Sequence, residues 1–135
     1  MAGYSGTPLW KKLGYKPGIA SFVDGAPVQY LSLLELPEDV AVTWLARPKP
    51  GMGFAHVFAT RASVLRAKLR SHRGRIAPDG VLWVSWPKKS SGVATDITED
   101  VIRSVALPMG LVDIKVCAVD GTWSGLKLMI RKELR

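Results

Sequence analysis

Residues 81–92 read VLWVSWPKKSSG, and this stretch decides the fold. Its first six residues are apolar on both faces of an extended chain apart from Ser85, which is typical of a central parallel strand covered by helices on both sides. The strand ends in Trp86, and Lys88 and Lys89 follow almost at once. Open α/β sheets bind ligands at the carboxyl ends of their strands, so this junction is where we first expect a site.

The composition is that of a folded domain. The chain has 135 residues, of which 47% are hydrophobic and 22% charged, and it contains five tryptophans. These values argue against disorder, the length permits a core without covalent staples, and no linker or repeat divides the chain. We therefore expect residues 1–135 to form one α/β domain. The single cysteine, Cys117, excludes an intrachain disulfide and favours a packed thiol in a reducing compartment.

Charge and hydropathy narrow the possible partners. Residues 1–8 contain no apolar segment ahead of a cleavage site, and no apolar run approaches the length of a membrane span, so we expect a cytoplasmic protein without membrane contact. The net charge of +8 suits an acidic partner, whether nucleic acid, a phosphorylated small molecule or an acidic protein surface. Nucleic acid is expected to bind only weakly and without sequence specificity.

Hydrophobic periodicity and turn residues predict the remaining elements. Strands are expected at 19–23, 40–45, 54–59, 81–86, 114–119 and 123–131, and helices at 7–14, 28–34, 60–73 and from about 98 to 107. Turns are expected at 24–27 and 77–80, and Asp120 with Gly121 is a strong two-residue hairpin signal. This order predicts a small doubly wound sheet, mostly parallel, with helices on both faces and an antiparallel hairpin at its C-terminal end.

The helix predicted at 60–73 is rich in arginine. Thr60 is a candidate N-cap, and Arg66, Arg70 and Arg73 share one face of the helix. A solvated basic face is the first interpretation, and an anion-binding patch is the alternative. His72, near the end of this helix, is expected to face solvent.

Three stretches carry a resemblance to a known family. They are residues 9–18 (LWKKLGYKPG), 83–96 (WVSWPKKSSGVATD) and 110–120 (GLVDIKVCAVD). In these stretches the chain resembles a bacterial family of short proteins that is catalogued only as a domain of unknown function. That family in turn resembles a pared-down class I, Rossmann-like methyltransferase domain. The resemblance implies this fold and brings no established activity with it.

The sequence departs from the methyltransferase pattern at two places. Such enzymes follow their first strand with a glycine-rich turn, because a side chain there would clash with the cofactor. The equivalent turn at 24–27 has one glycine, and Pro27 removes an amide donor. They also place an acid after the second strand to hold the ribose hydroxyls, whereas this chain has Ala46 and Arg47 there. S-adenosylmethionine or a nucleotide is therefore a possible cofactor that the motifs do not support.

The loop after residue 86, together with the turn after the first strand, is the candidate ligand-binding site. The lysines supply charge, the hydroxyls supply hydrogen-bond donors, a glycine lets backbone amides face an anion, and the tryptophan offers a stacking surface. The residues are Asp24, Gly25, Trp86, Lys88, Lys89, Ser90, Ser91, Gly92 and Thr95. In the alternative, Asp96, Glu99 and Asp100 neutralise the lysines, the loop merely caps its helix, and the tryptophan is core.

No catalytic or metal site is predicted. His56 and His72 stand apart and Cys117 is single, so clustered ligands are missing. His56 is expected to be a hydrogen-bonded core histidine and Ser85 a packed hydroxyl. The leading hypothesis is a non-catalytic or cryptic module that binds an anionic small molecule such as a nucleotide. The alternatives are a divergent S-adenosylmethionine-dependent methyltransferase completed by a partner subunit, and a structural protein that assembles with copies of itself.

Overall fold

A computed structural model describes residues 6–135, so the expectations for residues 1–5 lie outside the described part. It contains a six-stranded sheet and four α-helices. The strands are β1 (Ala20–Asp24), β2 (Thr43–Trp44), β3 (Met52–Phe58), β4 (Ile76–Pro87), β5 (Leu111–Ala118) and β6 (Trp123–Ile130). The helices are α1 (Leu9–Leu13), α2 (Tyr30–Leu34), α3 (Ala62–Arg73) and α4 (Glu99–Ala106), with the short 3₁₀ turns η1 (Lys89–Ser91), η2 (Leu107–Met109) and η3 (Lys132–Leu134).

The strand order is β2-β1-β3-β4-β6-β5. The pairs β1–β2, β1–β3 and β3–β4 are parallel, whereas β4–β6 and β5–β6 are antiparallel. The prediction of a small doubly wound, mostly parallel α/β sheet with a C-terminal antiparallel hairpin is therefore confirmed.

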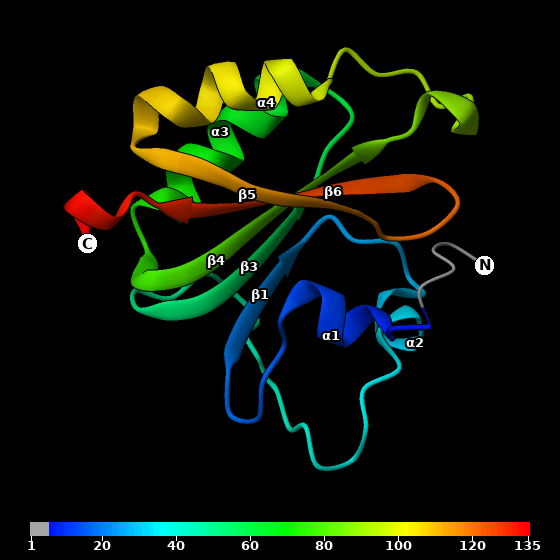
Figure 1. The fold of residues 1–135 in the computed structure, drawn as a ribbon, viewed down its shortest axis with the longest axis vertical. Coiled ribbons are helices and arrows are strands. Elements are labelled where there is room, and N and C mark those ends of the chain that lie inside the picture. Colours follow the sequence, from blue (N-terminus) through cyan, green and yellow to red (C-terminus); the bar gives the residue numbers. More distant parts are fainter. Residues whose placement is uncertain (1–5) are drawn as a thin grey trace.

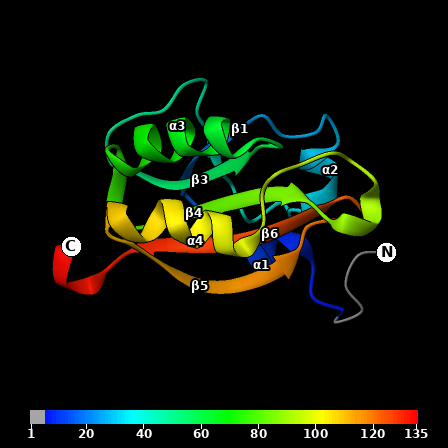
Figure 2. The same cartoon turned by 90° about the horizontal axis from the view of Figure 1, so that it is seen from above.

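Helices cover both faces of the sheet (Figure 1). In Figure 1, α3 and α4 lie above the strands and α1 and α2 lie below them, and Figure 2 shows α3 and α4 spread across the near face. Each face buries its own apolar cluster, one around Leu65 and Ile102 of α3 and α4 and the other around Leu13 and Tyr30 of α1 and α2. Two separate cores require strands that are apolar on both sides.

Strand β4 meets that requirement through its alternation. Val84 and Trp86 belong to the cluster under α3 and α4, and Trp83 belongs to the cluster under α1 and α2. The indole of Trp83 is fully buried and donates its Nε1–H to the carbonyl of Leu13 at 2.8 Å. This hydrogen bond fixes the end of α1 to the middle of the sheet.

The turn predicted at residues 77–80 is wrong, because these residues belong to β4. They form an irregularity of the strand: Met52 pairs with Ile76 and Phe54 already pairs with Val81, so extra residues bulge from β4. Gly80 is required there, since a Cβ would lie 2.6 Å from the Ile76 side chain and 3.0 Å from the carbonyl of Ala77.

Two other local predictions also need correction. Strand β2 has only two residues, Thr43 and Trp44, instead of the six expected. The loop between β5 and β6 is longer than a two-residue turn. Asp120 organises it by accepting backbone N–H bonds from Thr122 and Trp123, both at 2.8 Å.

Helix caps follow the sequence only in part. Thr98 caps α4 as expected, accepting the backbone N–H of Val101. Thr60 does not cap α3. The first helical amide of α3, that of Ala62, instead donates to Asp96 at 2.7 Å, so a residue 34 positions away in the sequence closes this helix end. Among residues 6–135 no helix has the length and hydropathy needed to cross a membrane.

Candidate functional site

The topology locates the crevice of the sheet between β1 and β3. From β1 the chain passes through α2 to β2 on one side, and from β3 it passes through α3 to β4 on the other. Connections that diverge in this way leave a gap at the carboxyl ends of the two strands, where open α/β sheets bind ligands. Asp24 ends β1 at this gap and Phe58 ends β3.

A salt-bridge cluster fills the gap. The Asp24 carboxylate is 2.8 Å from Nζ of Lys68 and 3.0 Å from Nε2 of His72, both from α3. The Lys68 ammonium also donates to the carbonyl of Phe58 at 3.3 Å. A Cβ on Gly25 would lie 3.1 Å from the same ammonium, so the lysine head occupies the space that the single glycine of this turn leaves open.

The cluster also lowers the pKa of Asp24. Partial burial would raise the pKa of Asp24, but the hydrogen bonds and positive charges of Lys68 and His72 outweigh it and lower the pKa below its ordinary value. The expectation that His72 faces solvent is wrong, because it is only 2% exposed. Its Nε2–H donates to Asp24, and its Nδ1 is buried without a hydrogen-bond partner in the described part of the chain.

The predicted anion loop lies at the same edge of the sheet, beyond β3. Its root is tied to the hairpin, since Lys88 donates its backbone N–H to Thr122. Two of its hydroxyls donate to backbone carbonyls of the protein: Ser91 donates to the carbonyl of Lys88 at 2.6 Å, and Thr95 donates to the carbonyl of Thr60 at 2.7 Å. Ser90 and Gly92 are exposed, and Gly92 has a φ of 74°, a left-handed conformation that suits glycine.

The lysines of this loop are not neutralised by the nearby acids. Asp96 accepts from the amide of Ala62, and both Glu99 and Asp100 pair with Arg103. Within residues 6–135 neither Lys88 nor Lys89 forms an ion pair. Trp86 is 7% exposed and packs in the core under α3 and α4. The structure therefore leaves two free lysines on the loop, with the tryptophan facing inward.

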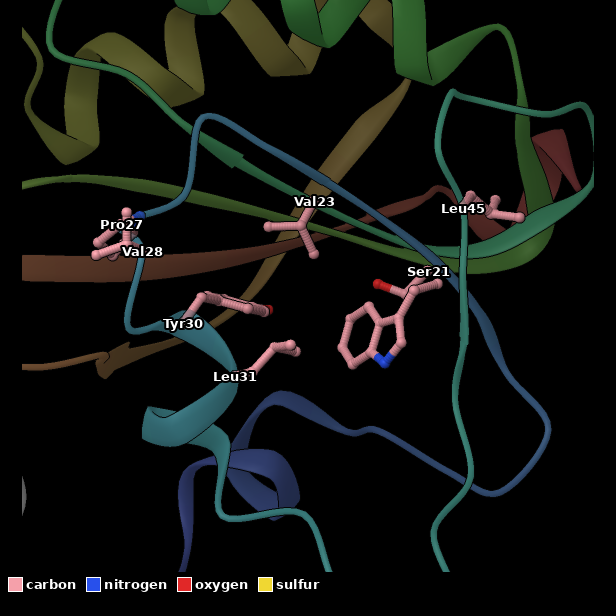
Figure 3. A pocket seen from close by; sticks show the side chains of 8 residues that line it. Ser21, Val23, Pro27, Val28, Tyr30, Leu31 and Leu45 are labelled. Atoms are coloured by element: carbon pink, nitrogen blue, oxygen red, sulfur yellow. The ribbon is translucent and has the colours of Figure 1, made fainter.

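A pocket lies on the other side of β1, between this strand, α2 and β2 (Figure 3). We call it the β1–α2 pocket; its volume is about 310 Å³. The lining residues are Ser21, Val23, Pro27, Val28, Tyr30, Leu31, Trp44 and Leu45. In Figure 3 the side chains of Ser21, Val23, Tyr30 and Leu31 point toward the same space. None of the loop residues 88–95 contributes to it.

The rim of the β1–α2 pocket is apolar and exposed. Val28 is fully exposed at 103%, Leu31 at 57% and Trp44 at 40%. Large apolar side chains in contact with solvent and gathered around a hollow are typical of a ligand site. The indole of Trp44 rests near the ring of Tyr15, with centroids 5.5 Å apart, and so is held from behind.

Behind this rim runs a buried chain of hydrogen bonds. It begins at Ser21 of β1, runs through Tyr15, Tyr30 and His56 of β3, and ends at Ser85 of β4. The distances are 3.1 Å for Ser21 Oγ to Tyr15 Oη, 2.8 Å for Tyr15 Oη to Tyr30 Oη, 2.8 Å for Tyr30 Oη to His56 Nδ1, and 2.8 Å for His56 Nε2 to Ser85 Oγ. All five residues are at most 4% exposed.

Burial holds this chain in its neutral form. Loss of hydration lowers the pKa of His56 to about 3 and raises the pKa of Tyr15 to about 12. Burial also raises the pKa of Tyr30 well above its usual value. The predictions of a hydrogen-bonded core histidine at His56 and of a packed hydroxyl at Ser85 are confirmed.

The sequence did not identify the β1–α2 pocket or the polar chain behind it. Tyr15 and Tyr30 were not singled out, because nothing in their spacing links them to His56. A signal for His72 was present, since it continues the buried stripe of Leu65 and Leu69 on α3. In the described residues no group of three or more His, Cys, Asp or Glu side chains is arranged to hold a metal ion.

Comparison with known proteins shows which solved structures share this fold. No protein-family model matches the chain, and no curated protein sequence matches it. Among solved structures it is similar to an S-adenosylmethionine-dependent methyltransferase from Aquifex aeolicus, with a TM-score of 0.65 and 15% identity over 89% of this chain and 86% of that one. It is also similar to a TehB-like methyltransferase from Corynebacterium glutamicum (TM-score 0.57, 12% identity, 90% and 85%). The N-methyltransferase NodS from Bradyrhizobium japonicum gives a TM-score of 0.57 at 12% identity, over 88% of this chain and 90% of that one.

The fold is methyltransferase-like, as the sequence resemblance implied. At these identities the likeness extends to the fold alone. No family-model match supports the resemblance to a family of unknown function.

Proposed function

We propose that this protein is a non-catalytic small-molecule-binding module of methyltransferase-like fold, and that it binds the nucleoside part of a ligand in the β1–α2 pocket. The observation that carries the proposal is the pocket itself. An exposed tryptophan, Trp44, and apolar side chains form its rim, and Ser21 and Tyr30, 0% and 4% exposed, lie behind it. A planar base fits this combination, because its faces favour aromatic and apolar contact.

The fold supports a nucleoside as the ligand class. The Aquifex and Corynebacterium proteins are described as S-adenosylmethionine-dependent, and an adenosine is part of that cofactor. The pocket lies beside β1, and the crevice of the sheet lies at the carboxyl end of the same strand. A ligand related to that cofactor by its nucleoside is therefore the first class to test.

Two features argue against a self-contained methyl-transfer centre. Lys68, paired with Asp24 and in contact with the carbonyl of Phe58, occupies the end of β1. The described residues that line the pocket include no carboxylate and no imidazole, so the pocket offers no group with a pKa suited to general base catalysis. His56 lies behind the pocket, fully buried, with its pKa lowered by burial to about 3.

The second candidate function is a divergent S-adenosylmethionine-dependent methyltransferase. The structural likeness to enzymes of that class favours it, with 89% of this chain aligned to the Aquifex protein. In that case a partner would supply the missing catalytic groups. Production of S-adenosylhomocysteine from S-adenosylmethionine by the purified protein would support this candidate over the binding module.

Calorimetric titration with adenosine, S-adenosylmethionine and S-adenosylhomocysteine tests the proposal. We expect at least one of them to bind, and the variant Trp44→Ala to weaken its affinity roughly tenfold, since stacking of a base on an aromatic ring contributes about 1–3 kcal/mol. Val116→Ala is the matched control, because Val116 is 48% exposed on β5 and lies outside the pocket. Equal affinity of Trp44→Ala and the wild type, or no heat with any of the three, would rule the proposed site out.

A further inference from the structure

The hairpin formed by β5 and β6 carries two lysines opposite each other. Lys115 of β5 pairs in register with Lys127 of β6. Lys127 lies between Leu126 and Leu128, which belong to the cluster under α3 and α4, so its own side chain points to the face that α1 covers. Lys115 shares that face, because residues directly opposite in a ladder project to the same side. Two like charges are therefore rooted opposite each other on one face of the sheet.

A β-bulge creates this arrangement. Asp113 pairs with Leu128 and accepts a hydrogen bond from α4 on the opposite face, and the register shifts before Lys115. In a regular ladder Ile114 would stand opposite Lys127, and the bulge puts Lys115 there instead. Like charges directly opposite each other are destabilising, and bulges that re-aim a side chain are frequent beside functional sites. The bulge thus brings two positive charges together at a cost in stability.

Two lysines of α1 and its C-terminal end extend the charged surface. Cys117 of β5 packs against the cluster around α1, and both views place α1 next to the hairpin (Figures 1 and 2). Burial lowers the pKa of Lys127, and the positive charges of Lys115 and Lys16 lower it further. Burial raises the pKa of the Cys117 thiol, and the charges of Lys115 and Lys12 oppose that rise. We call Lys12, Lys16, Lys115 and Lys127 the lysine patch.

The lysine patch is not neutralised within residues 6–135. None of its four members forms an ion pair there. The acids of the hairpin have other partners: Asp113 pairs with Arg103 of α4, and Asp120 accepts backbone amides of the hairpin loop. Two members of the patch are exposed and two are half-buried. An anionic partner can therefore reach it.

We propose that the lysine patch binds single-stranded nucleic acid through its phosphates, without sequence specificity. Lysines that contact phosphates release counterions, and this source of affinity needs no apolar contact. Interfaces with proteins and membranes also use exposed apolar side chains. Such side chains gather at the β1–α2 pocket, where Val28, Leu31 and Trp44 form the rim, whereas the members of the patch are all lysines.

The elements that carry the patch favour a single strand over a duplex. Proteins read a duplex by placing a helix or a ribbon in one of its grooves. Helix α1 has five residues and is held to the sheet by the bond from Trp83 to the carbonyl of Leu13, so it is not free to enter a groove. A single strand can follow the face of a sheet and bring successive phosphates to the lysines. The inference does not depend on the β1–α2 pocket or on its ligand.

Fluorescence anisotropy with labelled oligo(dT) at several salt concentrations tests the proposal. We expect the variant Lys115→Gln with Lys127→Gln to bind roughly tenfold more weakly than the wild type at low salt. The slope of log affinity against log salt should become shallower by about 1.4, because each phosphate neutralised on a single strand contributes about 0.7. The matched control is Arg66→Gln with Arg70→Gln, which removes the same charge from the exposed face of α3. Equal losses in the two variants, or no binding by the wild type, would overturn the proposal.

Two further probes identify other occupants: the duplex of oligo(dT) with oligo(dA), and vesicles that contain phosphatidylserine. We expect both to bind more weakly than oligo(dT) does. Tighter binding of either probe that is lost in Lys115→Gln with Lys127→Gln and kept in the control would assign the patch to that partner and overturn the proposal.

The melting temperature without any ligand gives an independent readout. Removing the repulsion between Lys115 and Lys127 should raise the melting temperature of the same variant a few degrees above that of the wild type at low salt, and added salt should shrink the difference. A melting temperature equal to or below that of the wild type would contradict the opposition of the two charges on which the proposal rests.

Discussion

His56 and Ser85 are fully buried and are bonded to each other at 2.8 Å. The apolar neighbours of Ser85 in its strand indicated a packed hydroxyl, and the apolar strand around His56 indicated a core histidine. Their further partners were beyond the reach of the sequence, because Tyr30 is 26 positions from His56 and approaches from another element. The phase of α3 placed His72 inside, against the expectation drawn from its position near the helix end.

At the residue scale we expect His56 to make stability depend on pH. The pKa of His56 is lowered to about 3 in the folded protein, so its imidazole stays neutral there while the unfolded chain binds a proton below about pH 6.5. The contribution of His56 to stability is therefore fully present above pH 6.5 and is lost as the pH is lowered toward 3, by an amount on the order of 5 kcal/mol.

Urea unfolding at pH 7 and pH 5 measures this dependence. The variant His56→Gln should be less stable at pH 7 and should lose less stability than the wild type when the pH is lowered. An identical pH dependence in the variant and the wild type would mean that His56 does not titrate as its burial requires.

At the scale of elements, the order of strands and helices was predicted, but several strand ends and the contacts of the loops were not. The segment after β4 was predicted to be a loop whose lysines either bind an anion or are neutralised by the acids that follow them. The structure adds that Thr95 and Asp96 reach back to the start of α3, where they bond to the carbonyl of Thr60 and the amide of Ala62. Such contacts join segments about 35 residues apart, so local spacing cannot reveal them. The loop is thus a clamp on the first turn of α3 as well as a candidate anion site.

Asp96→Ala tests the clamp. We expect the free energy of unfolding to fall by about 1 kcal/mol, because the first amide of α3 loses its acceptor. Asp100→Ala is the matched control: its side chain is 96% exposed and, within residues 6–135, pairs with Arg103, so a clearly smaller loss is expected. Urea denaturation of both variants gives the comparison, and equal losses would contradict the clamp.

The anion loop is tested by replacing both lysines, Lys88→Ala with Lys89→Ala. We expect millimolar pyrophosphate to raise the melting temperature of the wild type by a few degrees and to have no such effect on this variant. The control is Arg66→Ala with Arg70→Ala, which removes the same charge from the exposed face of α3. If the control loses the response equally, the effect is one of net charge, and the loop is not an anion site.

At the scale of the whole molecule, the sheet was predictable because apolar strand segments and amphipathic helices follow one another in a regular order along the chain. The β1–α2 pocket was not, since it depends on how short two elements are: α2 has five residues and β2 has two. With so little structure over this end of β1, Val28, Leu31 and Trp44 remain exposed around a hollow. The hydrophobic pattern predicted a six-residue second strand, and the predicted site lies on the opposite side of β1.

Self-assembly through the hairpin is the alternative that concerns the whole molecule. Strand β5 is an edge strand with Ile114 and Val116 each 48% exposed, but its register shifts between Asp113 and Lys115. A bulge and a lysine on an edge strand oppose pairing with another chain. We expect light scattering after size exclusion to give a monomer near 14.7 kDa at every concentration tested. A mass that rises with concentration would support assembly instead.

An NMR titration of the ¹⁵N-labelled protein with adenosine reports where on the molecule a nucleoside binds. We predict that the largest shift changes fall on residues lining the β1–α2 pocket, including Ser21, Leu31 and the indole N–H of Trp44. Changes confined to residues 88–95, or no saturable change at all, would contradict the claim that this pocket is the binding site.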